Sequence, residues 1–341
     1  MSRSALRDLP LSRSAVDRDH EARSRPALFD ELWAEPTTRI LPLWRGRALV
    51  TAESVAAATP GSDGWGTARD GERATLELLP VERVTSALVR VYLGRTLVEA
   101  PGEPAGSAIV LSVLTDAAAT ELEPDETRWA NLRTVGTVMS DRDAGLFTEA
   151  LGIANWHASH THCPRCGTPT VVERGGWVRR CFEDETEIFP RTDPAVIVSV
   201  LDQDDRLLLG SNAMWENTRF SLLAGFVEPG ESFEAAVERE IFEEAGVRVV
   251  DPEYLGSQPW PFPASVMVGF TARLAQDQDP DALMPDGDEI LDLRWFTRDE
   301  VWSNREFVIL PGRTSIARAI IEDWYGGPLD EPPAPASAGE R

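Results

Sequence analysis

Short apolar runs rich in Val, Ile and Leu recur between residues 38 and 114, and turn residues such as Gly, Asp and Pro separate them. This pattern predicts β-strands joined at hairpin-like spacing. The expected strands are Thr38–Leu43, Arg47–Thr51, Ala74–Leu79, Ser86–Leu93 and Ala108–Leu114. They predict a small β-rich domain. Because none of its residues has catalytic spacing, we expect the domain to serve packing or dimerisation.

The pattern becomes helical from Asp141, where apolar residues fall on one face of a helix at Leu146, Ala150, Ile153 and Trp156. Further along, strands alternate with helices, and this order predicts an α/β/α sandwich. The expected strands are Ala195–Leu201, Arg206–Leu209, Phe220–Leu223, Val266–Leu274 and Leu291–Phe296, and the expected helices are Ser232–Ala245, one beginning near Arg298, and Arg313–Tyr325.

The helix over Ser232–Ala245 has an unusual distribution of charge. Phe233, Val237 and Ile241 recur every four residues and predict its apolar face, and Gly246 ends it. At three and four residues apart, Glu240, Glu243 and Glu244 share the other face and repel one another. Arg239 is the only cation within this group, and it can pair with Glu243. A hard divalent cation with oxygen ligands would neutralise the remaining charge.

Composition narrows the class of protein. The 341 residues include 33 Lys and Arg against 57 Asp and Glu, for a net charge of −24. This excess argues against a broad surface for nucleic acid or anionic membranes. Three cysteines cannot form a disulfide framework in a chain this long, so we expect a reducing compartment. The N-terminus lacks the apolar core of a signal peptide and no apolar run reaches membrane-spanning length, so we expect a cytoplasmic location without membrane partners.

Three cysteines have the spacing of a metal-binding ribbon. Cys163 and Cys166 lie two residues apart and Gly167 follows them, which is typical of a zinc knuckle. Cys181 begins a second knuckle, in which Asp184 occupies the place of a fourth cysteine. Three thiolates and this carboxylate could hold one structural zinc ion per chain, and the other candidates for the fourth ligand are His160, His162 and Glu183. The alternative is a ribbon that folds without metal.

Two longer motifs carry a family resemblance. Gly225, Glu231, Arg239-Glu240, Ile241, Glu243-Glu244, Gly246 and Val247 match the Nudix box. Ser257–Ser265, in which prolines alternate with Trp260 and Phe262, resembles the signature of the NADH pyrophosphatase branch of the Nudix hydrolases. The segment from Asp143 to His160 resembles the linker helix before the zinc ribbon of that branch. The box alone does not identify a substrate, whereas the proline–aromatic signature is far more selective.

The resemblance implies a Nudix α/β/α sandwich that hydrolyses the pyrophosphate of NADH or NAD⁺ to nicotinamide mononucleotide and AMP. It also implies removal of NAD caps from RNA 5′ ends. About two or three Mg²⁺ or Mn²⁺ ions would activate a water molecule, and Glu243 or Glu244 would accept its proton. The metal ligands implied are the backbone carbonyl of Ala224 and the side chains of Glu240, Glu243, Glu244 and Glu289.

The residues implied in substrate binding lie in separate parts of the chain. They are Phe189, Gln258, Pro259, Trp260, Pro261, Phe262, Pro263, Ala264, Ser265, Glu289 and Ala317. Three prolines in the loop cannot belong to a helix or a central strand, so a stiff loop is expected to present Trp260 and Phe262 to a flat aromatic ligand. Family members form homodimers, and we expect a dimer here.

The expected domain organisation is a disordered N-terminus (1–25), a β-rich domain with its linker helix (26–155), a zinc-ribbon-like unit (156–190), a Nudix domain (191–326) and a disordered tail (327–341). Two alternatives to NADH hydrolysis stay open. One is a Nudix hydrolase for ADP-ribose or a dinucleoside polyphosphate, and the other is a catalytically silent zinc-ribbon module that binds nucleotides. Around the ribbon, RNA phosphates could meet a group of arginines: Arg165, Arg174, Arg179, Arg180 and Arg191.

Overall fold

The computed structural model describes residues 6, 9–55, 73–214 and 218–330. The chain divides into two compact units. The first consists of Met1–Leu9, Asp193–Gln258 and Val266–Arg341, and the second of Pro10–Thr192 and Pro259–Ser265. Most of the predicted C-terminal tail lies outside the described residues, from residue 331 onward.

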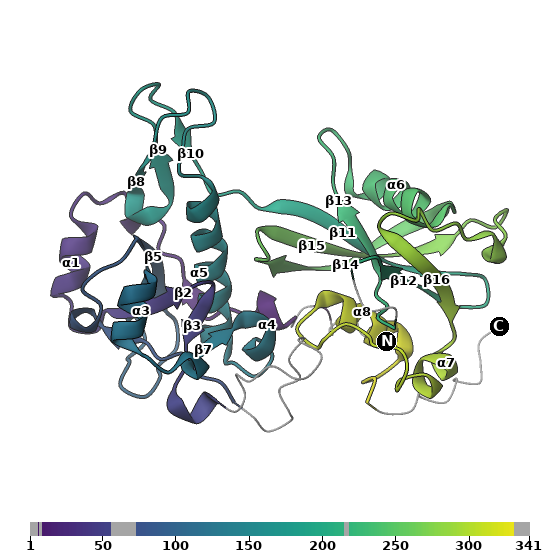
Figure 1. The fold of residues 1–341 in the computed structure, drawn as a ribbon, viewed down its shortest axis with the longest axis horizontal. Coiled ribbons are helices and arrows are strands. Elements are labelled where there is room, and N and C mark those ends of the chain that lie inside the picture. Colours follow the sequence, from purple (N-terminus) through teal and green to yellow (C-terminus); the bar gives the residue numbers. More distant parts are fainter. Residues whose placement is uncertain (1–5, 7–8, 56–72, 215–217, 331–341) are drawn as a thin grey trace. The chain divides into compact units, whose positions relative to one another are not determined.

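A mixed β-sheet forms the body of the second unit (Figure 1). Its strands follow the order β1-β5-β6-β2-β3-β7, with β4 paired to β2. Strands β2 and β6 are parallel, whereas β5 and β6 are antiparallel. The strands are β1 (Val16–Asp17), β2 (Arg39–Trp44), β3 (Arg47–Leu49), β4 (Leu79–Pro80), β5 (Val89–Thr96), β6 (Ala108–Val113) and β7 (Trp129–Asn131).

The β-rich character predicted for this part of the chain is therefore present. The expected strand over Ala74–Leu79 is the exception, because only isolated bridges at Ala74 and Leu76 precede the short β4. Short helices connect the strands or cover the sheet. They are α1 (Leu28–Ala34), α3 (Asp116–Leu122) and α4 (Leu132–Val135).

Residues 10–25 differ from the expectation of a disordered N-terminus. Leu11 is buried in the core of the second unit, and β1 pairs with β5. The guanidinium of Arg13 donates hydrogen bonds to the carbonyls of Gly136 at 2.8 Å and Met139 at 3.1 Å. The abundance of Arg and Asp suggested a mobile segment, but these side chains anchor the backbone instead.

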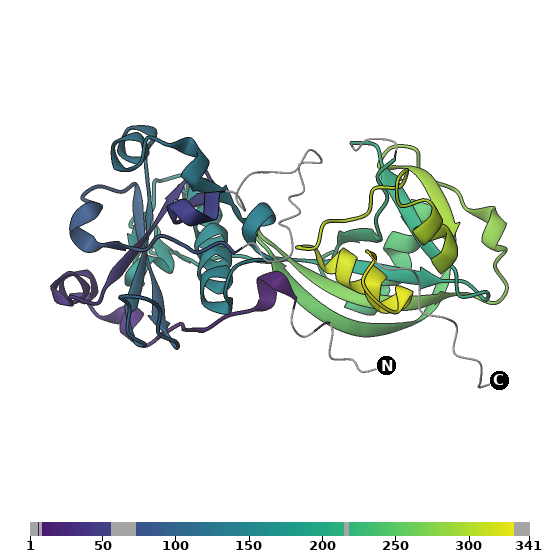
Figure 2. The same cartoon turned by 90° about the horizontal axis from the view of Figure 1, so that it is seen from below.

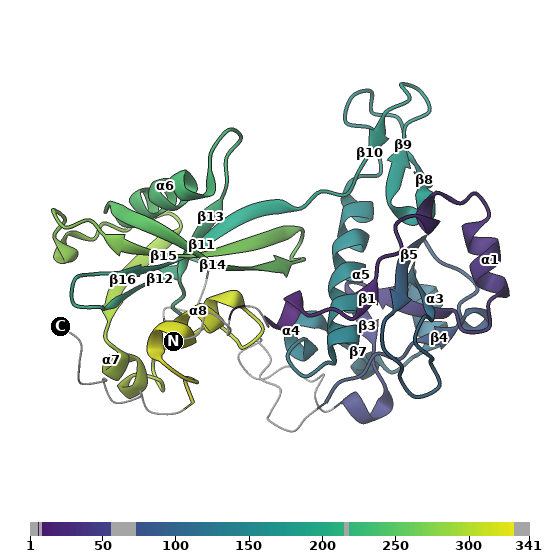
Figure 3. The ribbon, with the colours of Figure 1, turned by 180° about the vertical axis from the view of Figure 1, so that it is seen from behind.

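The longest described helix of this unit, α5 (Asp141–Ser159), packs against the sheet and carries the zinc-ribbon-like segment after its C-terminal end (Figures 1 and 3). Ser140 caps its first turn by accepting a hydrogen bond from the backbone of Asp143. The predicted apolar face is buried: Leu146, Ala150, Ile153 and Trp156. The ribbon contains β8 (Val171–Glu173), β9 (Val178–Arg180) and β10 (Glu187–Ile188), which form their own small antiparallel sheet.

The first unit is the predicted α/β/α sandwich. Its sheet follows the order β14-β15-β11-β12-β16, with β13 paired to β11. Helix α6 (Phe233–Ala245) covers one face, and α8 (Ile316–Tyr325) covers the other (Figures 1 and 2). Helix α7 (Arg298–Ser303) follows β16. The strands are β11 (Asp193–Leu201), β12 (Leu207–Asn212), β13 (Leu223–Phe226), β14 (Val249–Trp260), β15 (Ser265–Leu274) and β16 (Ile290–Phe296).

Separate apolar cores lie on the two faces of this sheet. Val237 and Ile241 of α6 join the core with Val196 and Val198 of β11. Ile316 and Ile320 of α8 join the core on the opposite face, together with Ile197 of β11. Alternation along β11 therefore sends successive side chains into opposite cores, as a strand between two helical layers requires. Phe233, predicted on the apolar face of α6, is instead 41% exposed, because it lies in the first turn, at the end of that face.

Strand β14 was not predicted. Its residues include Asp251, Pro252 and Pro259, which are unfavourable in central strands. The strand lies at the end of the sheet order, where an edge tolerates proline. The proline–aromatic signature is consequently divided, since Trp260 ends β14 and only residues 261–264 form the turn to β15. Among the described residues, no helix is long and apolar enough to span a membrane.

Candidate functional site

Strand β13 and helix α6 build the candidate site in the first unit. Ser232 caps α6 by accepting a hydrogen bond from the backbone N–H of Ala235 at 3.1 Å. The helix ends at Gly246, whose φ of 70° is the left-handed conformation that glycine adopts most readily. A loop joins β13 to the start of α6. Before this loop, Gly225 lies within β13 opposite Val196 of β11. The loop between Gly225 and Ser232 is therefore fixed at both ends.

Gly225 leaves space for the Glu240 carboxylate. A Cβ atom placed on Gly225 would lie 1.9 Å from Cδ of Glu240 and 2.1 Å from each of its carboxylate oxygens. No side chain fits at that distance, so the glutamate rests directly on the strand backbone. Burial raises the pKa of Glu240, and the neighbouring charge of Glu243 acts in the same direction, while Arg239 opposes both.

Arg239 organises the loop. It donates hydrogen bonds to Glu231 at 2.7 and 2.9 Å, to Glu243 at 2.8 Å and to the carbonyl of Phe226 at 2.9 Å. It also pairs with Glu240 at 2.9 Å. Glu231 in turn accepts a hydrogen bond from the backbone of Glu228, so its position in the sequence motif reflects a structural role. The predicted Arg239–Glu243 pair is present, but one guanidinium shared by three carboxylates cannot neutralise them.

Glu244 is buried, although it lies on the side of α6 that carries the other glutamates. The residue is only 4% exposed. Its Oε2 atom is buried and has no hydrogen-bond partner among the described residues. Burial raises the pKa of Glu244 to about 8, and the negative charges of Glu240, Glu289 and Asp286 add to this effect. An uncompensated buried carboxylate beside other carboxylates is costly, and a bound cation would remove that cost.

The loop before β16 supplies the acidic residues that complete this group. Glu289 was predicted from the resemblance, and its charge acts on both Glu240 and Glu244. Asp286 was not predicted. Although burial opposes the shift, hydrogen bonds from the backbone amides of residues 287–290 lower the pKa of Asp286 and keep it charged. The only sequence feature that could have indicated Asp286 is its position close to Asp288 and Glu289 in one acidic loop. Acidic residues in such loops usually face solvent without a specific role.

The arrangement can bind hard cations. The negative charges of α6 and of the loop before β16 act on Glu244, whose carboxylate is also hydrogen-bonded to the backbone of Ala224, the residue predicted to supply a carbonyl ligand. Hard divalent cations take oxygen ligands of this kind. The orphaned Oε2 of Glu244 and the excess of negative charge both fit such an ion.

The predicted substrate-binding residues fall in different places. Pro259–Ser265 belong to the second unit, as does Phe189, which is 56% exposed. Gln258 and Ala317 belong to the first unit and are buried. The side chain of Gln258 donates to the carbonyl of Thr314 at 3.0 Å and accepts from the backbone of Ile316 at 2.8 Å. Gln258 therefore joins β14 to the start of α8.

In the second unit, Trp260 and Phe262 form an edge-to-face pair with ring centroids 4.9 Å apart. The guanidinium of Arg133 lies 3.8 Å from the centroid of Phe262 and 4.8 Å from that of Trp260. This spacing is that of a strong cation–π contact. Arg133, on α4, was not predicted, because nothing in its local sequence points to a partner more than a hundred residues away.

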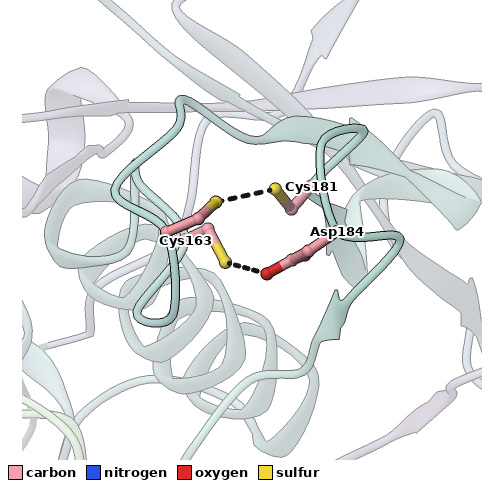
Figure 4. A group of neighbouring side chains, drawn as sticks. Cys163, Cys181 and Asp184 are labelled. Atoms are coloured by element: carbon pink, nitrogen blue, oxygen red, sulfur yellow. Dashed lines mark hydrogen bonds between the residues drawn. The ribbon is translucent and has the colours of Figure 1, made fainter.

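The ribbon brings its predicted ligands together. Donor atoms of Cys163, Cys166, Cys181 and Asp184 all lie within 4.8 Å of one another. Sγ of Cys166 is 3.5 Å from Sγ of Cys181, close to the edge of about 3.8 Å that a tetrahedron with zinc–sulfur bonds of 2.3 Å would have. Cys163 lies 3.3 Å from Oδ2 of Asp184, and Figure 4 shows Cys163, Cys181 and Asp184 directed toward one another. The alternatives His160, His162 and Glu183 are not in this group.

The arginines around the ribbon are mostly occupied by contacts within the chain. Arg179 is buried and donates to Thr170 and to His157. Arg174 and Arg180 both pair with Glu187. Arg174, Arg179 and Arg180 are therefore engaged within the ribbon or its neighbouring helix.

Matches to known families agree with this geometry. Residues 191–317 match the NUDIX domain, 158–189 the NADH pyrophosphatase zinc ribbon domain, and 37–156 the NADH pyrophosphatase-like rudimentary NUDIX domain. The first unit thus has the fold of a Nudix domain. The chain therefore combines a segment that matches the NUDIX domain with segments that match the NADH pyrophosphatase zinc ribbon and the rudimentary NUDIX domain.

Two relatives of known name match part of this chain. The NAD-capped RNA hydrolase NudC of Mycobacterium bovis is 48% identical over 204 residues, which cover 57% of this chain and 64% of the relative. The human NAD-capped RNA hydrolase NUDT12 is 36% identical over 201 residues, which cover 54% of this chain and 42% of the relative. The match therefore spans less than two thirds of the length of either protein. A NUDIX hydrolase structure from Nitrosomonas europaea aligns with 49% of this chain and 94% of its own, at 25% identity and a TM-score of 0.39.

Proposed function

We propose that this protein hydrolyses the pyrophosphate of NADH and NAD⁺ to nicotinamide mononucleotide and AMP, and that it removes NAD caps from RNA 5′ ends. The observation that carries the proposal is the carboxylate cluster around Glu244. The names of the matched ribbon and N-terminal domains support a dinucleotide substrate, as do the names of the two relatives.

The proposed metal ligands are the Ala224 carbonyl, Glu240, Glu243, Glu244 and Glu289, with Mg²⁺ or Mn²⁺ as the ion. Bound there, the metal would supply charge neutralisation and an acidified water molecule. Glu240 rests against Gly225, and Glu244 has a buried oxygen without a hydrogen-bond partner, which a cation could occupy. Glu243 is exposed and in contact with water, and we assign it the proton-accepting role beside Glu244.

The aromatic pair Trp260 and Phe262 supplies a surface on which a base of the dinucleotide can stack, with Phe189 as a further aromatic contact. Stacking of this kind contributes about 1–3 kcal/mol per base. The other predicted residues of the signature that belong to the second unit would shape this subsite. We also propose a homodimer and one structural zinc ion held by Cys163, Cys166, Cys181 and Asp184.

A substrate panel tests the proposal. Purified protein with Mg²⁺ or Mn²⁺ is given NADH, NAD⁺, ADP-ribose, a dinucleoside polyphosphate and NAD-capped RNA, at two salt concentrations. We expect the nicotinamide dinucleotides to have the highest kcat/KM. A preference for ADP-ribose or for the polyphosphate would replace the proposed substrate, and no metal-dependent hydrolysis of any compound would favour the catalytically silent alternative.

A further inference from the structure

The turn between β14 and β15 has few hydrogen-bond donors of its own. Pro259, Pro261 and Pro263 have no backbone N–H, so only alternate residues of this stretch can donate. The N–H of Phe262 is already directed at the carbonyl of Trp260, at 2.7 Å. The carbonyls of Pro261 and Pro263 therefore depend on donors from outside the turn.

Asn155 of α5 supplies both donors. Its Nδ2 atom donates to the carbonyl of Pro261 at 3.0 Å and to the carbonyl of Pro263 at 2.9 Å. One amide nitrogen thus uses its two hydrogens on the two carbonyls that flank Phe262. All these residues belong to the second unit.

Other groups of the second unit also contact this turn. Gly152, one turn earlier on α5, faces Pro261, and a Cβ at Gly152 would lie 3.7 Å from the Pro261 side chain. On the other side of the turn, Arg133 contacts both aromatic rings. Trp260 and Phe262 pack against the buried core of the second unit. Asn155 fixes the backbone, and Arg133 and the core fix the rings.

We propose that Asn155 is a positioning residue for substrate binding, which acts by holding the backbone that carries Trp260 and Phe262. This inference rests on the proposed function, because it assigns the aromatic pair to the base of a dinucleotide. A ring displaced by a fraction of an ångström loses part of its stacking contact. The proposed chemical step depends on the carboxylate cluster, which belongs to the other unit, so we expect it not to change.

The amide is the group that matters. Asn155→Asp preserves size but replaces the donor by an acceptor that faces two carbonyl oxygens. Asn155→Ala removes the group without adding repulsion. The matched control is Ser159→Ala, one turn further along α5, since the Ser159 hydroxyl bonds at the end of the helix, to the carbonyls of Asn155 and Trp156 and to Nδ1 of His160.

Steady-state kinetics with NADH and Mg²⁺ give the first test. Losing hydrogen bonds of this type costs about 1 kcal/mol, so we expect Asn155→Ala to raise KM by about five-fold or more. Asn155→Asp should raise it further, while kcat stays within about two-fold for both. The Ser159→Ala control should match the wild type. An equal fall in kcat for both Asn155 variants without a change in KM, or equal effects in the control, would overturn the proposal.

Hydrogen–deuterium exchange gives a test that needs no activity. The peptide spanning residues 259–266 should exchange faster in Asn155→Ala and Asn155→Asp than in the wild type or the control, while peptides of the β11–β12 region stay unchanged. Faster exchange with an unchanged KM would overturn the role in substrate binding. Unchanged exchange would overturn the positioning itself. If the wild type did not hydrolyse NADH but exchange still rose, the proposed function would fail and the structural role of Asn155 would stand.

Discussion

The carboxylate of Glu240 occupies the space that a side chain on Gly225 would need. A Cβ built on Gly225 would lie 1.9 Å from Cδ of Glu240. Gly225 pairs with Val196 inside a sheet, so the strand cannot easily move away. We predict that Gly225→Ala displaces Glu240, weakens Mn²⁺ binding and lowers kcat/KM by more than about ten-fold. Titration of Mn²⁺ followed by electron paramagnetic resonance measures the binding.

Gly327→Ala is the control for this substitution. No atom lies within 4 Å of a Cβ added at Gly327, and its φ is not in the left-handed region. This variant should keep the metal affinity and the activity of the wild type. If Gly225→Ala also kept both, the close approach of Glu240 to β13 would have no functional role.

Glu244→Gln tests separately how the buried carboxylate affects stability and how it affects hydrolysis. We expect this variant to lose hydrolysis by at least about a hundred-fold while its fold is retained. Its melting temperature without metal should be equal to or above that of the wild type, because an uncharged amide relieves repulsion among the carboxylates. Mn²⁺ should raise the melting temperature of the wild type much more than that of the variant.

The exposed Glu238 on the same helix offers a matched control. Glu238→Gln changes the net charge by the same amount but lies outside the cluster, so its activity and its response to Mn²⁺ should follow the wild type. A Glu244→Gln enzyme with near-wild-type turnover would exclude this residue from the metal site.

Asp184 is predicted to be the fourth ligand of a zinc ion. Zinc content measured on protein purified without chelators should approach one ion per chain for the wild type and fall for Asp184→Ala. Asp184→Cys should retain zinc more tightly against a chelator, because four thiolates suit this ion well. Glu183→Ala should behave as the wild type. Less than about 0.3 zinc per wild-type chain would contradict the assignment.

Glu149 on α5 should make stability depend on pH. Burial raises its pKa to about 7, although Arg18 and Arg23 oppose the shift. Since the folded-state pKa lies above the unfolded value, the contribution to stability is fully present below pH 4.5 and is lost as the pH rises through 7. Between pH 6 and 8 the wild type should lose about 1 kcal/mol of unfolding free energy from this group.

Urea unfolding at several pH values checks this expectation, with Glu149→Gln as the comparison. The difference in unfolding free energy between the two proteins should change with pH over that interval. A constant difference would show that Glu149 has the same pKa in the folded and unfolded states.

Much of the site could be predicted because helical spacing fixes its geometry. Three glutamates at intervals of three and four residues had to lie near one another on α6. Spacing could not tell which would be buried, whereas in the structure Glu244 is only 4% exposed and lies near enough to Glu289 and Asp286 for their charges to act on it. The effect of Asp286 on Glu244 depends on how the loop and the helix pack in three dimensions, so no local pattern distinguishes Asp286 from the other acidic residues of its loop.

The fold follows the apolar pattern where strands are central, as in β11, and departs from it at the edge. Strand β14 contains prolines and charged residues because an edge requires fewer ladder hydrogen bonds. The contact of Arg133 with Phe262 joins positions far apart in the chain. Such pairs follow from tertiary packing, which a single sequence does not encode in any local pattern.

The most direct test of the account is the identification of the products formed from NADH by the wild type and by Glu244→Gln, each with Mg²⁺ and with EDTA. Chromatography should find reduced nicotinamide mononucleotide and AMP in equal amounts, only for the wild type with Mg²⁺. Cleavage at another bond, the same products in EDTA, or equal product from Glu244→Gln would contradict the claim that this carboxylate cluster splits the pyrophosphate of a dinucleotide.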